Sequence, residues 1–277
     1  MELGLAVLPP IVEHTHTVIF LHGRGDTAQD FSEALFWSRD SARRSLKDIF
    51  PSVRWVFPQS ELRLCEGLGE DWSQWFDIWN MLDFSEQEEM QAPGLRESVL
   101  SIRRLVYREA SRVGGLDKVV LAGISQGGAT AVHSLLHLGV PDDGMLTGEL
   151  TGANTPPLRL GAFLGFSCWL PFPGGTLEET REVLGLEGSP SDEILRHTPV
   201  FLGHCADDAV IFVEYGKQLR NSLYDFDMDV AWKEYPDGGH WINSPRAIDD
   251  AVEFLIAQGV PTDQPVEVIS DDSMEVD

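Results

Sequence analysis

A serine between glycines is the first residue of the chain whose setting suggests chemistry. The stretch VLAGISQGGA covers residues 120–129, with Ser125 at the centre of a Gly-x-Ser-x-Gly pattern. The pattern is typical of a sharp strand-to-helix turn that exposes a hydroxyl, because side chains at the glycine positions would collide. Ordinary glycine–serine turns show it too, but the apolar run before Ser125 and the helix-forming residues after it favour a nucleophile.

A serine hydroxyl is a poor nucleophile near neutral pH, so Ser125 needs a general base. In hydrolases built on such a turn the chain order is serine, acid, histidine. Of eight histidines, only His240, in the glycine-rich stretch PDGGHW, follows the candidate acids. A purely structural turn histidine is the alternative. We expect the other histidines to be structural. His133 and His137 are four residues apart on a predicted helix and could hold a metal together, but no third ligand is evident.

Two neighbouring aspartates, Asp207 and Asp208, are the candidate acids. They follow an apolar run in FLGHCADDAVIF. A carboxylate here would accept a hydrogen bond from Nδ1 of His240, fix its tautomer and stabilise the imidazolium. Either aspartate could instead cap a helix that begins near residue 211. The residue types leave the choice between the two open.

Backbone N–H groups must stabilise the oxyanion that forms when a serine attacks a carbonyl. One candidate is the N–H of Gln126, directly after the nucleophile, and the other is the N–H of Arg24 in the loop FLHGRGDTAQDF. Residues 24–26 also spell the adhesion tripeptide Arg-Gly-Asp. A position in a strand-to-helix turn disfavours that interpretation.

Apolar runs and amphipathic segments alternate along the chain. The runs lack clean alternation, as expected for strands buried on both faces of a parallel sheet. We predict an α/β fold with a mostly parallel central sheet and helices on both faces. Strands are predicted at 17–21, 53–57, 118–123, 160–166, 199–204 and 228–235, and helices at 31–49, 93–113, 126–138, 212–223 and 245–257.

Length and composition favour a single domain over residues 1–260. Residues 140–158 are rich in Gly, Thr, Asp and Pro and predict an inserted surface loop. Residues 261–277 hold six acidic side chains and no Lys or Arg, which predicts a disordered tail.

The formal net charge of −25 argues against nucleic-acid partners and against charge-driven membrane binding. Any lipid contact would be apolar and transient, since no stretch is long and apolar enough to be a transmembrane segment. Three widely spaced cysteines match neither a disulfide framework nor a metal motif, and no signal peptide is apparent. We therefore expect a cytoplasmic protein.

Five ordered motifs, namely LHGRGDT, WFDI, GISQGG, FSCWLPF and GGHW, resemble those of acyl-protein thioesterases, within the phospholipase/carboxylesterase family of α/β-hydrolases. The resemblance covers roughly residues 16–258. It implies an α/β-hydrolase fold without a cofactor or metal. It also implies hydrolysis of acyl thioesters on S-palmitoylated proteins, with lysophospholipids and small esters as further or alternative substrates. A broad carboxylesterase and a non-catalytic protein that binds apolar ligands are the alternatives.

The resemblance also bears on individual residues. It selects Asp208 as the acid, through the similarity of HCADDAVI to the family's HGxxDxxV. It implies that Trp169, Leu170 and Phe172 line the acyl site, although their pattern also fits core packing. Three features depart from the family: Cys205 in place of glycine, the long 140–158 loop, and Arg24 in place of an apolar residue. A free Arg24 side chain would favour polar or anionic acyl groups.

Overall fold

A seven-stranded sheet forms the centre of the computed structural model, which describes residues 3–139, 158–186 and 190–263. The strand order is β1-β3-β2-β6-β7-β8-β9, with every pair parallel except β1 and β3. The strands are β1 (Leu5–Leu8), β2 (His16–Leu21), β3 (Val53–Pro58), β6 (Val119–Ile124), β7 (Ala162–Phe166), β8 (Val200–Cys205) and β9 (Val230–Tyr235). All residues of β6, β7 and β8 are buried, which explains why their sequences do not alternate.

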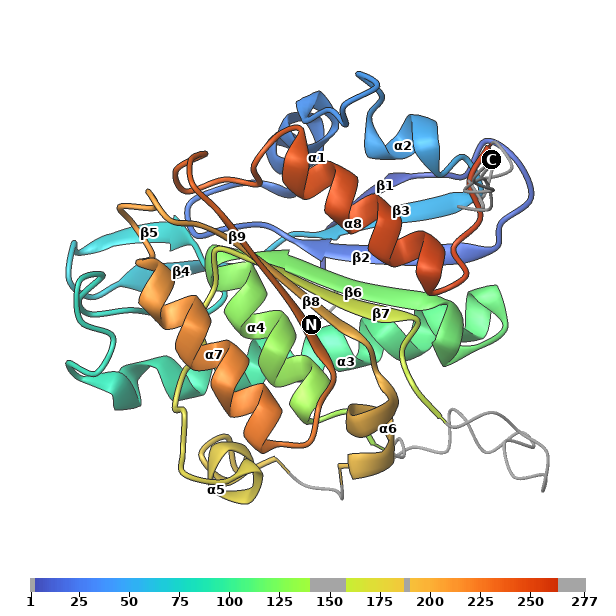
Figure 1. Cartoon of the computed structure of the whole chain (residues 1–277). Coiled ribbons are helices and arrows are strands. Elements are labelled where there is room, and N and C mark those ends of the chain that lie inside the picture. The colour runs from blue at the N-terminus through green and yellow to red at the C-terminus, as the bar shows by residue number, and fades with distance from the viewer. Residues whose placement is uncertain (1–2, 140–157, 187–189, 264–277) are drawn as a thin grey trace, which may run out of the picture.

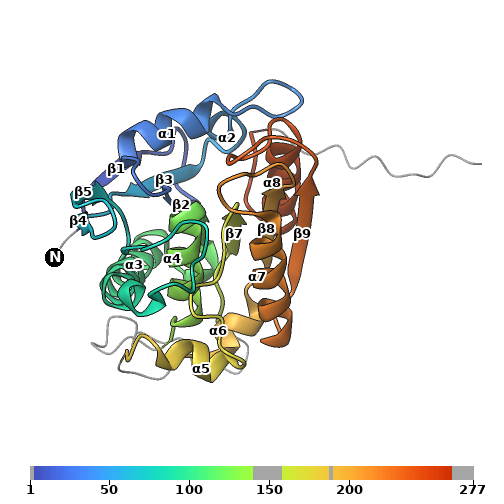
Figure 2. The same ribbon diagram turned by 90° about the vertical axis from the view of Figure 1, so that its left-hand side faces the viewer.

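Helices cover both faces of this sheet (Figures 1 and 2). One face carries α3 (Gln91–Val113), α4 (Ser125–Leu136) and α7 (Val213–Asp225), whose apolar side chains join one buried cluster. The other carries α1 (Ala28–Trp37), α2 (Leu46–Ile49) and α8 (Arg246–Ala257), which join a second cluster. The parallel strands therefore end together at one edge of the sheet, between two helical layers.

The predicted α/β architecture is confirmed, and the six predicted strands are present. The predicted continuous helix over 31–49 is wrong. After α1 ends at Trp37 the chain turns, with Arg43 in the left-handed region at φ 62°, and a capping box of Ser45 and Asp48 begins α2. This local hydrogen bonding competes successfully with helix continuation.

Several short elements were not predicted. They are the edge strand β1, the hairpin of β4 (Leu62–Cys65) and β5 (Glu70–Ser73), the 3-10 turns η1 (Glu88–Met90) and η2 (Leu116–Lys118), and the helices α5 (Leu177–Glu182) and α6 (Asp192–His197). Elements of three to six residues carry too few positions for a periodic pattern to show.

The predicted 140–158 loop and acidic tail lie almost entirely outside the described residues. Among the residues that are described, no helix has the length and apolar character needed to cross a membrane.

Candidate active site

Ser125 lies directly after β6, at the first residue of α4. Its backbone is in the left-handed region, with φ 55°. Such a conformation is unfavourable for a residue with a side chain and is found where a sharp turn aims a group out of the sheet. The predicted strand-to-helix turn around Ser125 is therefore present.

The flanking glycines are required by close backbone contacts. A Cβ built on Gly123 would lie 2.5 Å from the carbonyl oxygen of Gly127, and one built on Gly127 would lie 2.3 Å from the carbonyl oxygen of His22. No real Cβ fits at such distances. The turn can form only without side chains at these two positions.

Asp208 and His240 form a hydrogen-bonded pair at the same edge of the sheet. Nδ1 of His240 lies 2.8 Å from Oδ2 of Asp208, whose side chain is fully buried. Oδ1 of Asp208 accepts from the backbone N–H groups of Val210 and Ile211, at 2.9 Å each. Asp208 therefore contacts the histidine and the turn that follows it, but it does not cap α7, whose N-cap residue is Phe212.

The pKa of Asp208 lies well below its usual value. Burial opposes ionisation, but hydrogen bonds from His204 and His240, together with the charge on His240, outweigh it. Nε2 of His204 donates to the carbonyl of Ile211 at 2.8 Å and lies 3.5 Å from Oδ2 of Asp208. His204 was expected to be structural, and the structure places it beside Asp208.

Asp207 and Cys205 support the loop that carries His240. Oδ1 of Asp207 accepts from the backbone N–H of Gly239 at 2.8 Å. The thiol of Cys205 lies beneath Gly238, where a Cβ would come within 2.7 Å of its sulfur. Burial, then the nearby charges of Asp207 and Asp208, raise the pKa of Cys205 to about 11, so it stays a neutral thiol. The substitution of cysteine for the family's glycine is therefore accommodated by packing.

The loop with Arg24 lies beside Ser125. A Cβ built on the preceding residue, Gly23, would be 3.6 Å from Cβ of Ser125. His22 shapes this loop, since its Nδ1–H donates to the carbonyl of Gly23 at 2.7 Å while Nε2 accepts from the N–H of Ser60. Burial lowers the pKa of His22 and keeps it neutral. The predicted second oxyanion loop is thus adjacent to the nucleophile.

Gln126 uses its side chain to hold the segment that contains the WFDI motif. Its Oε1 accepts from the backbone N–H of Trp75 at 2.9 Å, and its Nε2 donates to the carbonyl of Phe76 at 2.7 Å. Its backbone N–H belongs to the first turn of α4, where N–H groups have no partner within the helix. That geometry leaves the N–H available to an oxyanion.

The side chain of Arg24 is not free, contrary to the expectation from sequence. Its Nε donates to Oε1 of Gln74 at 2.8 Å, and one terminal nitrogen lies 2.8 Å from the sulfur of Cys65 and 3.8 Å from Oδ1 of Asp77. The guanidinium also lies over the ring of Trp72, 5.4 Å from its centroid. The Arg24 side chain is therefore not free to select anionic acyl groups.

Trp169, Leu170 and Phe172 lie after β7, beside the strand that leads to Ser125, and all three are buried in the apolar core. The ring of Trp169 stacks on Phe84 with 4.3 Å between centroids. A role in binding the acyl chain remains a prediction, and it would require at least one of these side chains to be uncovered.

The ring nitrogens of His133 and His137 contact backbone carbonyls. Nε2 of His133 contacts the carbonyl of Pro171, and the two ring nitrogens of His137 contact the carbonyls of His133 and Arg181. Burial, then the neighbouring His137, lowers the pKa of His133 to about 3. The described residues contain no cluster of three or more ligand side chains that could hold a metal ion.

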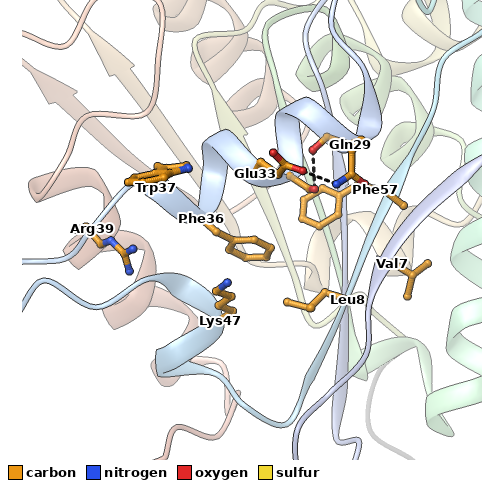
Figure 3. A pocket seen from close by; sticks show the side chains of 11 residues that line it. Val7, Leu8, Gln29, Glu33, Phe36, Trp37, Arg39, Lys47 and Phe57 are labelled. Carbon is orange, nitrogen blue, oxygen red and sulfur yellow. Dashed lines mark hydrogen bonds between the residues drawn. The ribbon is translucent and has the colours of Figure 1, made fainter.

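A hollow of about 420 Å³ lies between α1 and the edge strand β1 (Figure 3). Ser125, Asp208 and His240 are not among the residues that line it. Val7, Phe36, Trp37 and Lys47 contribute to its lining, which includes Ser32 but no histidine to activate it. The constellation of Ser125, Asp208 and His240 is the better candidate for chemistry.

The sequence model of the phospholipase/carboxylesterase family matches residues 3–258. The chain belongs to this family. Its curated relatives include acyl-protein thioesterase 1 of Gibberella zeae, 29% identical over 92% of this chain and 95% of that protein. Another is acyl-protein thioesterase 1 of Cryptococcus neoformans, 27% identical over 78% of this chain and 76% of the relative.

Solved structures similar to this family member include acyl-protein thioesterase 2 of Zea mays. It superimposes with a TM-score of 0.67 at 24% identity, covering 92% of this chain and 98% of that one. Esterase PE8 gives 0.63 at 22% identity, covering 93% and 99%. These likenesses confirm the α/β-hydrolase fold, and the family match confirms the expected hydrolase of acyl esters or thioesters.

Proposed function

We propose that this protein is a serine hydrolase that cleaves acyl thioesters or esters through an acyl-enzyme on Ser125. The observation that carries the proposal is the hydrogen bond of 2.8 Å between Asp208 and His240, formed at the edge of the sheet where the strained turn presents Ser125. A nucleophile after β6, a buried acid after β8 and a base after β9 are the parts that acyl transfer requires.

The carboxylate of Asp208 makes Nδ1 of His240 the protonated ring nitrogen, because an anion accepts from that atom. Nε2 is then left with a lone pair to take the proton of Ser125 as its oxygen attacks the acyl carbonyl. The N–H groups of Arg24 and Gln126 stabilise the oxyanion.

The thiol or alcohol leaves with the proton held by His240. His240 then deprotonates a water molecule, which attacks the acyl group on Ser125. The bond between the acyl carbon and Oγ breaks, His240 returns the proton to Oγ, and the free acid is released. The ionised Asp208 stabilises the imidazolium in both half-reactions. This chemistry uses protein groups alone.

Acylated proteins and lysophospholipids are the proposed substrates, because the curated relatives reported above carry the name acyl-protein thioesterase and the matching family model is that of phospholipases and carboxylesterases. The competing proposal is a carboxylesterase that acts on small soluble esters.

A substrate panel distinguishes these two activities. We expect kcat/KM for a long-chain acyl thioester to exceed that for a short aryl ester with an equally good leaving group by about tenfold or more, since a buried chain adds binding energy per methylene. Steady-state hydrolysis of both compounds and of lysophosphatidylcholine measures this. A preference for the short ester would favour the carboxylesterase, and no turnover of any compound would contradict the proposed activity altogether.

The pH dependence of kcat/KM should reflect the loss of a single proton from the enzyme. Because the pKa of Asp208 is held low, this carboxylate stays ionised where imidazoles titrate, and only neutral His240 acts as base. The logarithm of kcat/KM should therefore rise with pH at a slope of one and then level off. A slope of two, measured with an uncharged ester on protein shown to be folded throughout, would contradict this assignment.

A further inference from the structure

We propose that residues 74–77, which we name the clasp, set the positions of both oxyanion donors, and that Arg24 is a positioning residue that acts through it. The inference rests on the proposed function. It assigns to the Arg24 side chain a task in the chemical step rather than in substrate selection.

The clasp holds the two donor residues by their side chains. Gln126 is bound to the backbone of Trp75 and Phe76, while Arg24 is bound to the side chains of Gln74 and Asp77. The clasp also reaches the strand end before Arg24, since Nε1 of Trp75 donates to the carbonyl of His22 at 2.9 Å. One short segment thus fixes residues that lie about a hundred positions apart in the chain.

The groups that receive Arg24 are themselves fixed. Gln74 is fully buried, and its Nε2 donates to the carbonyls of Arg63 and Leu64, which turns its Oε1 toward Arg24. Asp77 accepts from the backbone N–H groups of Glu66 and Ile78. A guanidinium is planar and rigid, so partners held in this way define its position closely.

The side chain of Arg24 links these fixed partners to the loop that carries its own backbone N–H. Its side chain is 11% exposed, so its contacts are little screened by water. The next residue, Gly25, donates to the carbonyl of Ser73 at 2.7 Å and packs against the Trp72 ring. The loop is therefore bound on both sides of the N–H that we assign to the oxyanion.

Replacing Arg24 by leucine should lower kcat by roughly 10- to 100-fold with KM nearly unchanged, because a displaced oxyanion donor weakens an interaction made only in the transition state. The loss should be equal for neutral and anionic acyl groups. Arg24→Lys should retain more activity than Arg24→Leu, since an ammonium keeps the charge but cannot reach Gln74, Cys65 and Asp77 together.

Gln74→Met tests the same contact from the clasp side. The effects of Arg24→Leu and Gln74→Met on kcat should be less than additive in the double variant, because each removes the shared hydrogen bond. Arg196→Met is the control. It removes an arginine from α6, where its side chain pairs with Asp227, and it should keep kcat within about twofold.

The inference is overturned if Arg24→Leu lowers kcat no more than Arg196→Met does, or if it changes KM and acyl preference instead. It is also overturned if Arg24→Leu lowers only the melting temperature while the folded variant keeps its kcat. Ser125→Ala, assayed alongside, separates the two levels. Full activity there would refute the proposed function, whereas lost activity there with an unimpaired Arg24→Leu refutes only the role of the clasp.

Discussion

Replacing Ser125 by alanine should reduce kcat/KM by roughly 10³-fold or more and abolish labelling by a fluorophosphonate probe. The alanine removes the atom that forms the acyl-enzyme but leaves the oxyanion donors and the fold in place, so only residual catalysis over water remains. Ester hydrolysis and gel-based labelling of the purified variant measure both effects.

Ser167 offers a matched control for this change. It too is a buried serine with positive φ, at 43°, directly after a parallel strand, β7. Ser167→Ala should keep full labelling, because the buried hydroxyl of Ser167 makes no hydrogen bond to a base in the described part of the chain. Labelling that survives in Ser125→Ala and disappears in Ser167→Ala would show that Ser167, after β7, is the nucleophile.

Replacing Asp208 by asparagine should lower kcat steeply while the protein remains folded. If the amide oxygen keeps the bonds to the N–H groups of Val210 and Ile211, the amide nitrogen must face Nδ1 of His240. Two donors cannot pair, so the ring adopts the other tautomer and Nε2 can no longer accept the serine proton. The corresponding change in serine proteases costs on the order of 10⁴ in kcat.

Asp207→Asn is the control for this experiment. The amide oxygen can still accept from Gly239, so we expect a loss of at most about 1 kcal/mol in stability and little loss of kcat. Both variants should be assayed with one ester and compared by circular dichroism. An inactive Asp207→Asn beside an active Asp208→Asn would show that Asp207, and not Asp208, is the catalytic acid.

The central fold and the turn that carries Ser125 could be predicted because they depend on local and strong signals. Buried parallel strands appear as continuous apolar runs, and the turn at Ser125 requires glycines at fixed positions that are visible in the chain. The choice of Asp208 over Asp207 needed the family resemblance. In the structure the buried carboxylate of Asp208 faces the ring of His240, whereas the exposed carboxylate of Asp207 faces the backbone of its loop.

The surroundings of these residues could not be predicted, since they depend on contacts between distant segments. Arg24 looked free because its partners, Gln74 and Cys65, lie 50 and 41 positions away. A charged residue between glycines gives no sign of whether it meets solvent or a buried amide. Trp169, Leu170 and Phe172 raise the same difficulty, because an apolar segment near a reactive centre looks alike whether it binds substrate or fills the core.

The left-handed backbone of Ser125 affects which residue evolution favours at this position. A residue with a side chain held in the left-handed region loses about 1–2 kcal/mol relative to an ordinary conformation, and glycine would avoid most of this loss. A population selected only for folding would therefore drift toward glycine at this position. If the lineage retains serine there, hydrolysis must be maintaining the residue against the preference of the fold.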